Sequence, residues 1–162
     1  MPYLIRTLIP FIWTNRFGSS YPRVKPFIQS LHAANPNTPI FVSGFCWGGK
    51  HVCLLSADPD THPLITAGFT GHPSQLSIPE EIHMLHNPVS FALAENDGRL
   101  QKDARDAIEK AIEGKDGEVV TYEGVGHGFC IRADHTRDAA REAAEKAEDQ
   151  CLKWFDRHLP RS

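Results

Sequence analysis

A cysteine between glycines, directly after an apolar run, is the feature of this sequence with the clearest chemical meaning. Cys46 lies within Gly44-Phe45-Cys46-Trp47-Gly48-Gly49, which follows the run Ile40-Phe41-Val42-Ser43. The apolar run predicts a buried strand, and the residues after the glycines predict a helix. A nucleophile between such a strand and helix occupies a tight turn, in which small neighbours avoid Cβ clashes. We therefore interpret Cys46 as a nucleophile, with a buried structural cysteine beside a glycine turn as the alternative.

The position of Cys46 also favours its ionised form. The start of a helix carries partial positive charge, which stabilises a thiolate. The same turn directs the backbone N–H of Trp47 toward the oxygen that becomes negative when a carbonyl is attacked. Trp47 is thus the candidate oxyanion donor, and its side chain is expected to pack against the turn rather than contact substrate.

Two further residues complete a candidate catalytic triad with Cys46. Asp97 follows an apolar run, within the turn-forming cluster Glu95-Asn96-Asp97-Gly98, where Glu95 is a nearby rival for the same role. His127 lies on a glycine-flanked loop after the next predicted strand, and a solvated loop histidine is the alternative. Both residues lie just beyond predicted strands, where open α/β sheets collect their active sites.

These segments together resemble the dienelactone hydrolase family of the α/β-hydrolase superfamily, over most of the chain. The matching segments are Gly44 to Gly49, Ala94-Glu95-Asn96-Asp97 and Gly126-His127-Gly128-Phe129. The resemblance implies hydrolysis of a carboxylic ester or lactone through a thioester, with no cofactor. It also implies that Cys46 attacks the carbonyl carbon and that His127 takes the thiol proton and later activates water. Asp97 would orient the imidazole and stabilise its charged form.

Strands and helices alternate along the chain, which predicts a mostly parallel sheet with helices on both faces. Four strands are expected, at residues 40–43, 65–69, 88–94 and 118–122. Helices are expected at residues 3–13, 22–34, 47–56, 99–112 and 137–158. We therefore expect a partial α/β-hydrolase fold of about four strands, forming a single domain over residues 1–162.

The segment before the first predicted strand is the main departure from the family. Only 39 residues precede Ile40, and they are expected to form helix and loop instead of the early strands of the larger family sheet. In the family, that early region supplies the second oxyanion donor and a glutamate that contacts the nucleophile, and no residue here matches either role. The first strand would present an unpaired edge, so we expect weak activity or a homo-oligomer that forms through this edge.

Three other residues are candidates for contact with substrate. His72 and Ser74 follow the second predicted strand and would face Cys46 across the pocket, unless they belong to a simple proline-containing turn. Arg132 lies five residues beyond the candidate histidine. An arginine of this region binds a substrate carboxylate in relatives, and a plain surface arginine is the alternative.

Composition excludes several classes of function. The chain has 162 residues and a formal net charge of −3, with no basic block that would indicate nucleic-acid binding. No apolar run approaches a membrane span, and the stretch 4–13 is broken by Arg6 and Pro10 and lacks a signal-peptide cleavage site. Four cysteines without C-x-x-C spacing indicate free thiols, so we expect a cytoplasmic protein. His83 and His86 lack a third ligand at suitable spacing, so no metal is expected.

Two other functions stay open at this point. A triad glutaminase also places its cysteine on such a turn, but it pairs the histidine with an acid two positions later, where this chain has Phe129. The other alternative is a catalytically inactive hydrolase-like protein that retains the site residues by descent and acts through protein association.

Overall fold

The computed structural model describes Arg6, Pro10, Thr14, residues 16–134 and residues 136–161. The chain divides into two compact units, residues 1–37 and residues 38–162. The first contains helix α2 (Phe17–Ala34), and the second contains the sheet and all the candidate site residues. The single domain expected from the sequence stays a prediction, and most of the helix expected at 3–13 lies outside the described residues.

Helix α2 begins earlier than the sequence indicates. Proline is common in the first turn of a helix, and this preference led us to expect a start at Pro22. The helix instead begins at Phe17, and Pro22 and Pro26 both lie inside it. The backbone N–H groups of Ser19 and Ser20 already donate to the carbonyl oxygen of Arg16, so the first turn forms before either proline.

Four parallel strands form the sheet of the second unit, in the order β1-β2-β3-β4. They are β1 (Phe41–Phe45), β2 (Ala67–Gly71), β3 (Val89–Asn96) and β4 (Gly117–Gly126). All of β2 and most of β3 are buried, as continuous apolar strands of parallel sheets are. Among the described strands, β1 pairs with β2 alone and so lies at an edge of the sheet.

Each strand extends further toward its carboxyl end than its apolar side chains indicate. The backbone pairing between β1 and β2 continues beyond the predicted apolar runs and joins Gly44 to Thr70 and Phe45 to Gly71. β4 likewise continues to Gly126, directly before His127. These extensions matter because the candidate site residues follow immediately after the ends of the strands.

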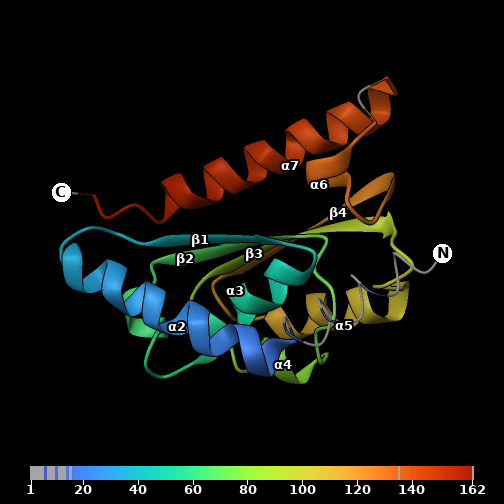
Figure 1. Cartoon of the computed structure of the whole chain (residues 1–162). Helices are drawn as coiled ribbons and strands as arrows, with labels where there is room; N and C mark the ends of the chain where they lie inside the picture. The colour runs from blue at the N-terminus through green and yellow to red at the C-terminus, as the bar shows by residue number, and fades with distance from the viewer. Residues whose placement is uncertain (1–5, 7–9, 11–13, 15, 135, 162) are drawn as a thin grey trace. The chain divides into compact units, whose positions relative to one another are not determined.

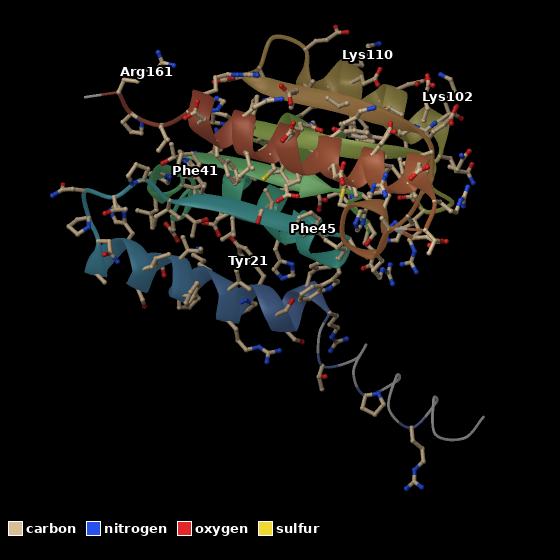
Figure 2. The ribbon with its side chains drawn as sticks, turned by 90° about the horizontal axis from the view of Figure 1, so that it is seen from above. Tyr21, Phe41, Phe45, Lys102, Lys110 and Arg161 are labelled. Carbon is tan, nitrogen blue, oxygen red and sulfur yellow. The ribbon has the colours of Figure 1, made fainter. Side chains whose placement is uncertain are left out.

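Helices cover both faces of this sheet (Figure 1). Helix α7 (Asp138–Arg157) lies over one face together with the short α6 (Phe129–Arg132), and Figure 2 shows α7 above the sheet with Phe41 and Phe45 near the two ends of β1. The other face is covered by α3 (Trp47–Ala57), α4 (Glu80–His83) and α5 (Lys102–Ile112). The four-stranded parallel sheet with flanking helices that the sequence predicts is therefore confirmed.

Two apolar clusters hold these layers together. The first joins β3 to α3, α4 and α5, with Phe91, Leu93 and Ile108 completely buried. The second joins the opposite face to α6 and α7 and includes Phe69, Phe129 and Ala147. Within the part of the chain that the structure describes, none of the helices has the length and apolar character that a membrane crossing requires.

The turn from β1 into α3 requires glycine at position 44. A Cβ atom on Gly44 would lie 2.3 Å from the carbonyl oxygen of Gly48, a backbone atom that cannot move aside without moving the helix. Gly48 itself has open space where its Cβ would be. The two glycines of the same motif therefore differ in what they contribute to the turn.

We expect Gly44→Ala to lower the free energy of unfolding by about 1–3 kcal/mol, because the added methyl group overpacks the turn. Gly48→Ala is the matched control. It should be neutral or slightly stabilising, since alanine favours a helix by about 0.5–1 kcal/mol over glycine. Urea unfolding of both variants and the parent measures the difference. Equal stabilities for the two variants would contradict this account of the turn.

Candidate active site

Cys46 lies in the turn between β1 and α3 with a strained backbone. Its φ of 53° and ψ of −116° are a conformation that side-chain-bearing residues rarely adopt, at a cost of roughly 1–3 kcal/mol. Three backbone hydrogen bonds hold it there. The N–H of Cys46 donates to the carbonyl of Gly71 at 3.1 Å, and its carbonyl accepts from the N–H of Ser74 at 3.1 Å and of Gly49 at 3.2 Å. The side chain of Cys46 is therefore fixed just beyond the end of β1.

The structure brings Cys46, His127 and Asp97 together from three separate loops. The Nε2 atom of His127 lies 3.0 Å from Sγ of Cys46, and its Nδ1 lies 2.8 Å from Oδ2 of Asp97. The carboxylate of Asp97 is fully buried, and its other oxygen accepts from the backbone N–H of Arg99 at 2.9 Å. With Nδ1–H donating to Asp97, Nε2 is the nitrogen left to accept the thiol proton.

Glu95, the rival acid, lies elsewhere. Its carboxylate accepts a hydrogen bond from the backbone N–H of Gly124 at 2.8 Å, at an exposed position. The geometry thus favours Asp97 as the partner of His127. Glu95 instead ties the end of β3 to β4.

The four cysteines differ in how readily they ionise. Burial acts to raise the pKa of the Cys46 thiol, but hydrogen bonds from His127 and Ser74, the charge of His127 and the backbone N–H of Trp47 outweigh it and lower this pKa below its ordinary value. Burial raises the pKa of Cys53 and Cys130 to about 12 and that of Cys151 to about 11. Among the four cysteines, Cys46 therefore has the surroundings that most favour the thiolate.

His72, which the sequence led us to expect across the pocket from Cys46, is directed toward the protein interior. Its side chain is completely buried, and its ring packs edge-on against the ring of His127 with 4.9 Å between centroids. Neither ring nitrogen has a hydrogen-bond partner among the described residues. A positive φ of 37° turns the chain at this position, and this turn directs the imidazole inward. Burial, reinforced by the charge of His127, lowers the pKa of His72 to about 4.

Ser74 and Arg132 both lie near the triad. The hydroxyl of Ser74 is buried and lies 3.6 Å from Sγ of Cys46, so it contacts the candidate nucleophile itself. Arg132 is exposed on α6, and its guanidinium lies against Gly128, the residue after His127, where an added Cβ would be 2.9 Å from Nη2. Arg132 is thus placed at the rim of the site.

The backbone N–H of Trp47 contributes to the environment of the Cys46 sulfur, which agrees with its expected place at the start of α3. Its side chain packs on the ring of His51, one helical turn further along, with 4.3 Å between ring centroids. The residue is still 37% exposed, so the expected packing of the indole away from substrate stays a prediction.

The sequence did not reveal how the loop Gly71–Ser74 braces the turn at Cys46. No motif marks this role, because the bracing depends on the parallel register that pairs Phe45 with Gly71. The segment Gly71-His72-Pro73-Ser74 predicted a turn. Its sequence did not indicate that backbone and side-chain groups of this turn would contact both Cys46 and His127.

Comparison with known proteins identifies the family of the chain. A sequence model described as the dienelactone hydrolase family matches residues 8–159. The chain belongs to the dienelactone hydrolase family. Hydrolase tropI of Talaromyces stipitatus is 29% identical over 142 residues, covering 85% of this chain and 53% of that protein. The carboxymethylenebutenolidase homolog of Rattus norvegicus is 26% identical over 135 residues, covering 81% and 52%. The chain thus spans about half the length of the curated relatives it matches.

Solved structures show the same fold. A dienelactone hydrolase-like promiscuous phosphotriesterase from metagenomic libraries superposes with a TM-score of 0.67 at 18% identity, covering 93% of this chain and 66% of that one. A dienelactone hydrolase structure from Klebsiella pneumoniae gives a TM-score of 0.60 at 21% identity, covering 72% and 51%. The second unit is accordingly a partial α/β-hydrolase fold, as the sequence predicts.

We expect His72 to make this protein less stable as the pH falls from about 6.5 toward 4. Unfolded chains bind a proton at His72 below about pH 6.5, whereas the folded protein keeps it neutral down to about pH 4, so acid favours unfolding. Between pH 7.5 and pH 5 the loss from this residue is about 2 kcal/mol. His72→Phe should remove that part of the pH dependence in urea unfolding. The exposed His83→Phe is the control, and identical pH dependence of both variants would contradict this interpretation.

Proposed function

We propose that this chain hydrolyses carboxylic esters or lactones through a thioester on Cys46. The observation that supports this most directly is the continuous set of contacts from sulfur to imidazole to carboxylate, at 3.0 Å and 2.8 Å. Membership of the dienelactone hydrolase family supports the class of reaction.

In the first half of the proposed reaction, Nε2 of His127 takes the proton of Sγ and the Cys46 thiolate attacks the carbonyl carbon. The carbonyl oxygen becomes negative and is stabilised by the backbone N–H of Trp47, at the positive end of α3. The carbon–oxygen bond to the leaving alcohol then breaks, and His127 gives its proton to that oxygen. In a lactone the freed hydroxyl stays attached to the acyl group.

In the second half, His127 takes a proton from a water molecule, which attacks the thioester carbon and releases the acid. Sγ leaves as a thiolate and takes back the proton that His127 holds, which returns the site to its starting state. Asp97 keeps the imidazole in the tautomer and orientation that both halves need, and it stabilises the imidazolium. Its burial and its second hydrogen bond to Arg99 fix the carboxylate for this task.

Arg132 gives the proposed site a preference for acidic substrates. Its exposed guanidinium beside Gly128 can bind a substrate carboxylate while the ester or lactone carbonyl reaches Cys46. The four unpaired cysteines support a reducing, cytoplasmic location.

We expect Cys46→Ala to abolish turnover of p-nitrophenyl acetate, because the variant lacks the nucleophile.

Asp97→Asn should lower kcat/KM for the same ester by at least about 100-fold, since the imidazole loses its orienting carboxylate.

Glu95→Gln is the matched control for the acid, because it neutralises a carboxylate two positions away that contacts Gly124 instead of His127. It should stay within about twofold of the parent. Turnover by Cys46→Ala equal to that of the parent would remove the case for a cysteine nucleophile and favour the inactive, associating alternative.

We also propose that two copies associate along the edge formed by β1. Ser43 is exposed on this strand and Phe41 and Phe45 are half-buried, so backbone and apolar groups are available for pairing. Sedimentation across a concentration series should show a dimer, and Ser43→Lys should weaken it, whereas the exposed control Gln101→Lys should not. A stable monomer at all concentrations would contradict this proposal.

A further inference from the structure

The sulfur of Cys46 has two side-chain hydrogen-bond partners among the described residues, and the catalytic scheme above uses only one of them. Nε2 of His127 lies at 3.0 Å and Oγ of Ser74 at 3.6 Å, a normal length for a hydrogen bond to sulfur. Ser74 is 2% exposed, so its hydroxyl is withdrawn from solvent. The contact between Ser74 and the sulfur has no role in that scheme.

The direction of this hydrogen bond follows from where the protons are. In the proposed reaction the thiol proton of Cys46 goes to Nε2 of His127, so the sulfur has no second proton to give to Ser74. The hydroxyl of Ser74 must therefore donate, and sulfur accepts. A thiolate accepts a hydrogen bond far more strongly than a thiol, so the contact favours the ionised form.

The backbone also fixes Ser74 in this place. Its N–H donates to the carbonyl of Cys46 at 3.1 Å, and the N–H of Cys46 donates to the carbonyl of Gly71 at 3.1 Å. A Cβ on Gly49 would lie 2.9 Å from the Cβ of Pro73, so the loop and α3 are in close contact. The hydroxyl is thus preorganised toward sulfur, with little freedom to turn away.

We propose that Ser74 is a catalytic residue: its hydroxyl donates to Sγ of Cys46 and holds the sulfur as an oriented thiolate, an inference that rests on the proposed nucleophilic role of Cys46. When the proton moves from Sγ to Nε2 of His127, no bond of Ser74 is made or broken. Ser74 keeps its proton throughout and stabilises the negative charge that the transfer leaves on sulfur. The lowered pKa of Cys46 agrees with this role.

The test is the pH dependence of alkylation of Cys46 by iodoacetamide, followed by peptide mass spectrometry on the full chain. This rate reports the thiolate fraction and requires no ester turnover. Ser74→Ala should raise the midpoint of thiolate formation by about one pH unit, since a hydrogen bond to a charged group is lost. Ser74→Thr, which keeps the hydroxyl, should have a midpoint close to that of the parent.

Ser56→Ala is the matched control, because Ser56 is also completely buried in this unit but its hydroxyl has no partner among the described residues. Its alkylation profile should match that of the parent. If Ser74→Ala fails to give cooperative unfolding, Ser74→Val replaces it, because valine has the shape of the threonine variant without the hydroxyl and should show the same shift relative to Ser74→Thr.

Unchanged midpoints in a folded Ser74 variant would overturn the proposal, even if Cys46 proves essential for hydrolysis. A shifted midpoint together with no ester hydrolysis by the parent would instead uphold the contact of Ser74 with the thiolate and overturn the proposed function. The two inferences therefore fail on different measurements.

Discussion

The strained backbone of Cys46 is the constraint on which the rest of the site depends. A positive φ at a residue with a side chain persists only where surrounding contacts compensate for it. Here the compensation comes from backbone hydrogen bonds to Gly71, Ser74 and Gly49 and from the close approach of Gly44 to α3. The same bonds that stabilise the strain direct the sulfur past the end of β1, within reach of an imidazole that comes from β4.

The parallel sheet explains why three residues so distant in sequence meet. The carboxyl ends of β1, β3 and β4 all lie at one edge, so the residues that follow them share a small volume. Each is then fixed locally: Asp97 by the backbone of Arg99, and His127 by the carboxylate and by the ring of His72. Because the fixing groups are mostly backbone or completely buried, the geometry is set before any substrate arrives.

The sequence predicted the parts of this arrangement that depend on local pattern and chain order. Apolar runs located the four strands, and a cysteine, an aspartate and a histidine after the first, third and fourth strands indicated the three residues that meet. The sequence did not predict that α2 would begin at Phe17 or that each strand would continue past its apolar run. Backbone hydrogen bonds, within the helix and between the strands, determine these ends. The inward turn of His72 was also missed, since a single positive φ, set by tertiary packing, determines where that ring lies.

Two neighbouring histidines have different surroundings in this packing. His127 is partly accessible and contacts a carboxylate, whereas His72 is completely buried with no hydrogen-bond partner in the described chain. A second positive charge 4.9 Å away, measured between ring centroids, would oppose the imidazolium that the proposed reaction requires. Because burial keeps His72 neutral, its ring can support His127 without competing for the proton. In the proposed reaction, His127 is therefore the imidazole that accepts the proton of Cys46, with Asp97 as its hydrogen-bond partner.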